Sequence, residues 1–172
     1  MCLYTNQVKI KTAEKDIICY KVMKKIRMGN NYGFSSIYYP KYYRIGEIYN
    51  NDLSLCLLSK TNKRNLNILE EDDLFNDTFE ENNDLYVIGY NKRTFEYSCD
   101  AGFHSYVDKK TVEYVYHLMS VYNRFLKIVK CVIPKGANYV EGYHYTICDD
   151  ILNEPGYVSD MIKIVEEVNL EN

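Results

Sequence analysis

The chain has one main segment with helical spacing, and strand-like runs lie on both sides of it. Its apolar residues at positions i, i+3, i+4 and i+7 are Val112, Val115, Tyr116 and Met119. This spacing places them on one face of a helix, and Asp108 stands before them in the position of an N-cap. We predict a helix over about residues 109–122, with His117 outside the apolar stripe and facing solvent.

The flanking runs are rich in Val, Ile and Tyr, as strands are. We predict strands at 16–26, 42–51, 85–90, 94–98, 125–133, 139–148 and 157–168, with turns at 29–33 and 153–156. Residues 53–58 fit a short strand or a helical turn. Residues 60–84, polar and acidic, are expected to form an irregular or partly helical insertion. The predicted fold is α+β, a mostly antiparallel sheet, continuous or split, with one main helix.

A chain of 172 residues is the size of one domain, and we treat 1–172 as such. The net charge of −3 without clustered Lys and Arg argues against a nucleic-acid partner. No apolar run approaches the roughly 20 residues of a membrane helix, so no membrane partner is expected. No apolar leader follows Met1, and the predicted location is the cytoplasm.

The six cysteines are Cys2, Cys19, Cys56, Cys99, Cys131 and Cys148. In a reducing compartment such scattered residues are expected to be unbridged thiols that pack as small apolar side chains. A zinc site from Cys99 and His104 with His144 and Cys148 would need unusual spacings. We therefore expect no metal and no cofactor.

The region most suited to a binding site lies between Ser98 and Tyr106. Phe103 is expected to point inward, which by alternation puts His104 on the opposite face, followed by Ser105 and a helix start. Helix N-termini expose N–H groups that favour anions, and Lys135 in the turn after Pro134 would add positive charge. We predict a ligand site at Phe103, His104, Ser105 and Lys135. A structural His104, bonded to a backbone carbonyl, is the competing interpretation.

Tyrosine is unusually frequent, with 19 copies and no Trp. A cluster of these rings lies at 38–43, around Pro40 and Lys41. A strand-and-turn surface explains it more simply than a base-stacking platform. If the functional surface is not near His104, this cluster is the next candidate.

Two motifs resemble an uncharacterised domain common in bacteriophage and prophage proteins. They are the Tyr-x-x-Gly-x-x-Tyr pattern of residues 43–49 and the Cys-x-x-Gly-Phe-His pattern of residues 99–104. The resemblance covers about residues 40–120. It implies a mobile-element origin, and a bacterial host cell as the compartment, without implying an activity.

The element order from Ala101 onward is similar to that of ADP-ribosyltransferases of the Arg/Ser-Thr-Ser/Glu class. In that resemblance Ser105 matches the motif serine, 134–137 the shared turn, and 157–162 the final strand. Tyr20 and Lys21 stand near the position of the family's NAD-anchoring Arg, and Asp160 stands where the family has its Glu. The resemblance implies an alternative site of Tyr20, Lys21, Ser105 and Asp160, with both charged positions substituted.

These observations favour a phage-type accessory protein that binds a host protein or a small anionic ligand without catalysis. The alternatives are an ADP-ribosyltransferase-like protein, active or degenerate, and a virion or structural protein. The lack of a Gly-x-Ser-x-Gly elbow or a P-loop argues against hydrolases and nucleotide kinases of those types.

Overall fold

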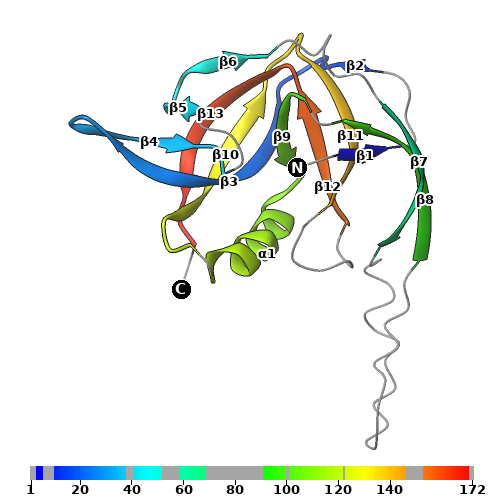
Figure 1. The fold of residues 1–172 in the computed structure, drawn as a ribbon. Helices are drawn as coiled ribbons and strands as arrows, with labels where there is room; N and C mark the ends of the chain where they lie inside the picture. The colour runs from blue at the N-terminus through cyan, green and yellow to red at the C-terminus, as the bar shows by residue number, and fades with distance from the viewer. Residues whose placement is uncertain are drawn as a thin grey trace, which may run out of the picture.

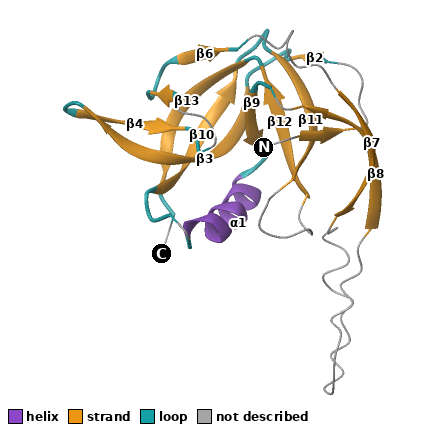
Figure 2. Cartoon of the chain, viewed as in Figure 1, coloured by secondary structure: helices purple, strands orange, loops and turns teal. Residues whose placement is uncertain are grey.

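The computed structural model describes residues 3–5, 10–37, 41–51, 59–68, 91–99, 101–121, 123–145 and 153–170. These residues form one helix and a 13-stranded sheet in which every pairing is antiparallel (Figure 1, Figure 2). The sheet curves strongly, and the helix lies beneath its arch. No helix among the described residues is long and apolar enough to cross a membrane.

The first half of the sheet has the order β6-β13-β10-β3, with β4 beside β3 and β5 beside β4. Its strands are β3 (Ile17–Met28), β4 (Asn31–Ser35), β5 (Tyr42–Tyr43), β6 (Ile48–Asn50), β10 (Leu126–Ile133) and β13 (Met161–Val168). A tight turn at Gly29, with φ +63°, joins β3 to β4. Long ladders between strands that are far apart in the sequence, such as β3–β10, hold this half of the sheet together.

The second half has the order β9-β12-β11-β1-β8-β7, with β2 beside β11. Its strands are β1 (Leu3–Thr5), β2 (Lys11–Thr12), β7 (Ser59–Ile68), β8 (Asn91–Cys99), β9 (Phe103–Tyr106), β11 (Asn138–Tyr145) and β12 (Asn153–Ser159). β9 is the strand that meets β3 of the first half.

The helix α1 (Lys109–Ser120) follows β9, as predicted. The Asp108 carboxylate caps it by accepting a hydrogen bond from the Thr111 N–H at 2.8 Å. Val112 and Val115 are fully buried, Met119 packs at the edge of the same cluster, and His117 is exposed. The helix packs against β3, β9 and β10, so its apolar face covers the middle of the sheet.

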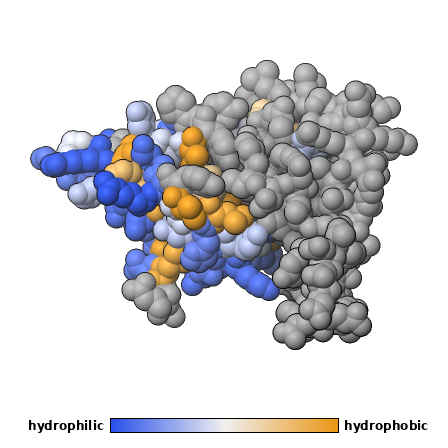
Figure 3. Space-filling view, turned by 60° about the horizontal axis from the view of Figure 1, so that its bottom comes forward, coloured by the Kyte–Doolittle hydropathy of each residue, from blue (hydrophilic) through white to orange (hydrophobic). Residues whose placement is uncertain are grey.

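The two faces of β3 and β10 bury different clusters, as alternation requires. Toward the helix lie Val22, Leu126 and Ile128. Toward the other face lie Cys19, Met23, Val129 and Cys131, which form the larger cluster with residues such as Phe103 and Tyr43. Figure 3 shows the side of the molecule nearest the helix, where hydrophilic side chains cover the β3–β4 hairpin and apolar ones gather beside it.

Several sequence-based boundaries were wrong. The predicted 42–51 strand is two short strands, and residues 59–68 form β7 although an irregular or helical insertion was expected. The predicted turn at 153–156 lies inside β12. The predicted 157–168 strand is broken at Asp160 into β12 and β13. The predictions for 53–58, 69–84 and 85–90 fall outside the described residues.

The expectation of six unbridged cysteines was also wrong. Cys99 is disulfide-bonded. Cys19 and Cys131 are free and buried, and they lie opposite each other on β3 and β10. The packing role expected of thiols therefore holds for this pair, whereas Cys99 is a covalent link.

Candidate functional site

β3 and β9 are neighbours whose pairing among the described residues is limited to Tyr20 and Tyr106. An antiparallel ladder continued from that pair would place Val22 opposite His104. The two strands separate instead, and the sheet opens between them. A cavity of about 290 Å³ occupies this opening.

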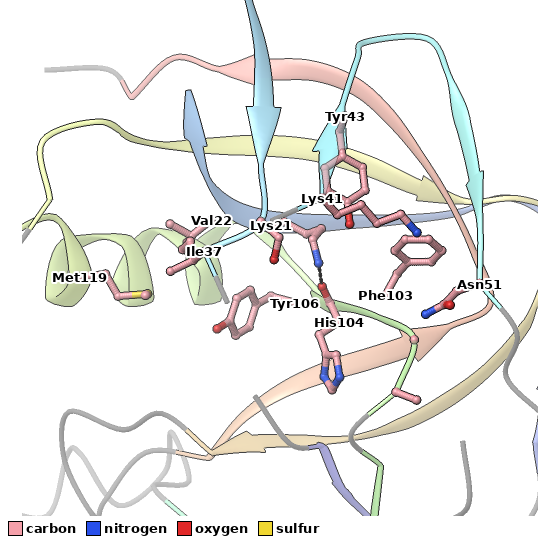
Figure 4. A pocket seen from close by; sticks show the side chains of 13 residues that line it. Lys21, Val22, Ile37, Lys41, Tyr43, Asn51, Phe103, His104, Tyr106 and Met119 are labelled. Atoms are coloured by element: carbon pink, nitrogen blue, oxygen red, sulfur yellow. Dashed lines mark hydrogen bonds between the residues drawn. The ribbon is translucent and has the colours of Figure 1, made fainter. Parts of the chain in front are cut away.

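The cavity wall combines an apolar body with a few polar groups (Figure 4). Its larger apolar side chains are Val22, Ile37, Phe103 and Met119, and its polar ones include Lys21, Lys41, Tyr43, Asn51 and His104. These residues come from β3, from the segments around β5 and β6, from the start of β9 and from α1. A mostly apolar concavity with a small number of placed polar groups is typical of small-molecule sites.

Lys21 reaches the cavity from the core face of β3. Strand alternation puts it between Cys19 and Met23, which are both fully buried. Its Nζ donates a hydrogen bond to the backbone carbonyl of His104, on the strand that separates from β3 (Figure 4). Desolvation by the surrounding core lowers the pKa of Lys21, while the nearby Cys131 and Cys19 oppose that shift.

Lys41 brings a second cation to the same cavity. Its Nζ lies 4.6 Å from the centre of the Phe103 ring, in cation–π range. The Tyr43 ring meets Phe103 edge to face at 6.3 Å. Burial raises the pKa of Tyr43 to about 12, so its hydroxyl is protonated at neutral pH and can donate to a ligand.

A buried aromatic group lies behind His104, on the same face of the second half. The His144 ring is 5.3 Å from the His104 ring and 5.2 Å from the Tyr106 ring. His144 Nε2 donates to the Ser105 carbonyl at 2.9 Å. A Cβ on Gly156 would lie 2.3 Å from this imidazole, so glycine is needed there. This packing fixes the backbone of β9 and hence the position of the His104 carbonyl.

The structure separates the residues of the predicted ligand site. Phe103 and His104 line the cavity. Ser105 is buried beside the Cys19 thiol, on the same face of β9 as Phe103, and it does not line the cavity. Lys135 lies in an exposed turn and does not line the cavity; its backbone N–H donates to the Asp16 carboxylate at 2.8 Å. The structure therefore does not place Lys135 with Phe103 and His104 in the wall of this cavity.

The alternative transferase-like residues are also dispersed. Lys21 lines the cavity, whereas Tyr20 packs in the cluster under α1. The Asp160 carboxylate accepts hydrogen bonds from the backbone and side-chain amides of Asn138, each at 2.9 Å. Ser105 is buried and does not line the cavity either. Of the four residues in this set, Lys21 is the one in the cavity wall.

Sequence reasoning placed no cavity role on Lys41, Tyr43, Asn51 or Met119. The tyrosine cluster at 38–43 was the available signal for the first two, and residues 38–40 of it lie outside the described ranges. Among the described residues there is no group of three or more His, Cys, Asp or Glu side chains arranged to hold a metal.

Comparisons were made with protein-family models, with curated proteins and with solved structures. None of the three finds a match to this chain. The geometry of the cavity is therefore the basis on which a function can be assigned.

Proposed function

We propose that this chain, an α+β protein that we take to fold as one domain, binds a small anionic ligand in the cavity between β3 and β9. One observation carries the proposal. Two lysines, Lys21 and Lys41, line a single cavity, and neither pairs with a carboxylate among the described residues. We call this cavity the lysine pocket.

A lysine surrounded by protein is seldom left without a compensating charge, because removing an ammonium from water is costly. The His104 carbonyl accepts one hydrogen bond from Lys21, whereas an ammonium carries three donors. A carboxylate or phosphate in the pocket would accept from the remaining donors and from Lys41. The ligand would thus supply the negative charge that the described part of the chain does not.

The other side chains that line the cavity indicate the chemistry of the uncharged part of the ligand. Val22, Ile37 and Met119 offer apolar contact on one side. The Tyr43 hydroxyl and the Asn51 side chain offer polar contact on another side. A volume of about 290 Å³ suits a compact molecule rather than a peptide or a nucleic acid. We therefore favour a small apolar or aromatic body that carries one anionic group.

As in the sequence analysis, we propose that the protein acts by binding and not by catalysis. Of the two kinds of partner considered there, we favour a small ligand over a host protein. The resemblance of residues 43–49 and 99–104 to phage domains supplies the setting we propose, an accessory protein of a mobile element in a bacterial cell. The transferase-like alternative has weaker support, because the Asp160 carboxylate is held by Asn138, and Ser105 is buried and does not line the pocket.

The test is a heteronuclear NMR titration with phenyl phosphate at constant ionic strength, with phenol as the uncharged control. We expect saturable shifts at β3 and β9 with phenyl phosphate and much weaker ones with phenol. Lys41→Met should weaken binding about 10- to 100-fold, the effect of losing a charged hydrogen bond. Lys135→Met is the matched control and should bind normally. Equal affinity for both compounds, or an equal loss in both variants, would reject the proposal.

A further inference from the structure

Lys21 lies on the core face of β3 at the cavity wall, and desolvation there lowers the pKa of its amino group, which favours the amine relative to an exposed lysine. Cys19 and Cys131 lie near its amino group, its Nζ donates to the His104 carbonyl, and Tyr43 and Lys41 line the same cavity. Burial raises the pKa of Cys19 to about 11 and that of Cys131 well above its usual value, so both are neutral thiols at pH 7. Tyr43 is neutral as well. Nothing in this set offers Lys21 a negative charge at neutral pH.

A neutral amine still satisfies the contact that the structure shows. It has two N–H donors and one lone pair, and one donor suffices for the His104 carbonyl. The lone pair is then free to face the cavity, where Lys21 is part of the wall. A desolvated lysine next to a second cation is an arrangement that activates amines as nucleophiles toward carbonyl groups.

We propose that Lys21 forms a reversible imine with an aldehyde or ketone that carries a carboxylate or phosphate, while Lys41 binds the anionic group. The choice of an anionic carbonyl compound rests on the proposed function above, since the lysine pocket supplies the cation. Imine formation adds a covalent step to binding. This step depends on the position of Lys21 in the cavity wall.

The reaction needs no oxidant or reductant. The Lys21 nitrogen attacks the carbonyl carbon, a proton moves from nitrogen to the new alkoxide oxygen, and a carbinolamine results. Loss of water then gives the C=N bond. Water reverses each step, so the ligand is released unchanged.

The test uses pyridoxal 5′-phosphate as an aldehyde probe, followed by borohydride, which reduces an imine to a stable secondary amine. Peptide mass spectrometry then locates the label. With limiting probe we expect Lys21 to carry at least ten times more label than any exposed lysine such as Lys135. Pyridoxal, which lacks the phosphate, should label Lys21 at least ten times more slowly. Label spread evenly over surface lysines would overturn the proposal.

Lys21→Arg tests covalent capture, because arginine forms no imine under these conditions. We expect this variant to lose the reducible adduct, and Lys135→Arg to retain it. Phenyl phosphate binding without trapping at Lys21 in the natural chain would overturn the imine and leave the anion site intact. Trapping at Lys21 by both probes at equal rates would support the imine and reject the anion site. The labelling map of the natural chain decides the matter even if Lys21→Arg does not fold.

Discussion

The Lys21 ammonium position and the His104 carbonyl meet where the β3–β9 ladder ends, and a side chain of one strand satisfies the backbone of the other. An unpaired buried carbonyl is unfavourable, so this contact stabilises the opening in the sheet. The opening is also where the cavity lies. The same lysine therefore maintains the gap and faces whatever occupies it.

Gly156→Ala is expected to destabilise the protein by about 1–3 kcal/mol, because its Cβ would overlap the buried His144 ring. The same atom would lie 2.6 Å from the Ser105 backbone oxygen, so rotation of the imidazole alone cannot relieve the overlap. Denaturant unfolding measures the loss. The double variant with His144→Ala should lose less than the sum of the two single changes. Strict additivity would show that the two residues do not share this contact.

The α1 face can be tested with neighbouring positions. Val115 is fully buried, so Val115→Asp places an unpaired charge in the core and should cost about 3 kcal/mol or more. Tyr114 on the same turn is 42% exposed, and Tyr114→Asp should have a much smaller effect. Thermal unfolding of the two variants gives the comparison. Similar melting temperatures for both would contradict the orientation of the helix.

Glu154 should make stability fall as pH rises from about 4.5 to 7. Burial, with a contribution from Asp108, raises the pKa of Glu154 to about 7, above the ordinary value of 4.5. Between these values the folded protein holds a proton that the unfolded chain releases, so ionisation favours unfolding. The penalty is fully present above pH 7 and amounts to about 1–2 kcal/mol after solvent screening.

Glu154→Gln removes this penalty. The variant should match the natural chain in unfolding experiments near pH 4.5 and exceed its stability at pH 8. A natural chain that is as stable as the variant at pH 8 would show that the carboxyl is well solvated.

Thiol titration of the unfolded, unreduced protein should find at most four thiols, because Cys99 and its partner are two of the six cysteines. Prior reduction should raise the count to six. Six thiols without reduction would show that Cys99 is not bridged.

Local signals predicted the parts of the fold that depend on local structure. The helix follows from a cap at Asp108 and an apolar repeat that includes Val112 and Val115, and all three act within a few residues of each other. The break at Asp160 is different. Its carboxylate is held by Asn138 from another strand, a contact that no local pattern encodes. Pro155 and Gly156 look like a turn in sequence, yet pairing with β11 keeps them in a strand.

The cavity was predictable only in part, for the same reason. Gly102, Phe103 and His104 formed a recognisable motif, and they do line the cavity. Lys21 was identified only through a family resemblance, and Met119 only as a core residue of the helix. Their meeting depends on β3 lying beside β9, a pairing between segments about eighty positions apart.

The described pairing of β3 and β9 is limited to Tyr20 and Tyr106, so few backbone hydrogen bonds join the two halves of the sheet there. We call this junction the seam. On one side the β3–β10 and β10–β13 ladders form a stiff unit, and on the other the β9–β12 and β12–β11 ladders form a second one. A molecule that binds Lys21 on one side and the Phe103–His104 edge on the other would act as an additional rung across the seam. Occupancy would then raise the free energy of unfolding by an amount that grows with the logarithm of the ratio of ligand concentration to Kd.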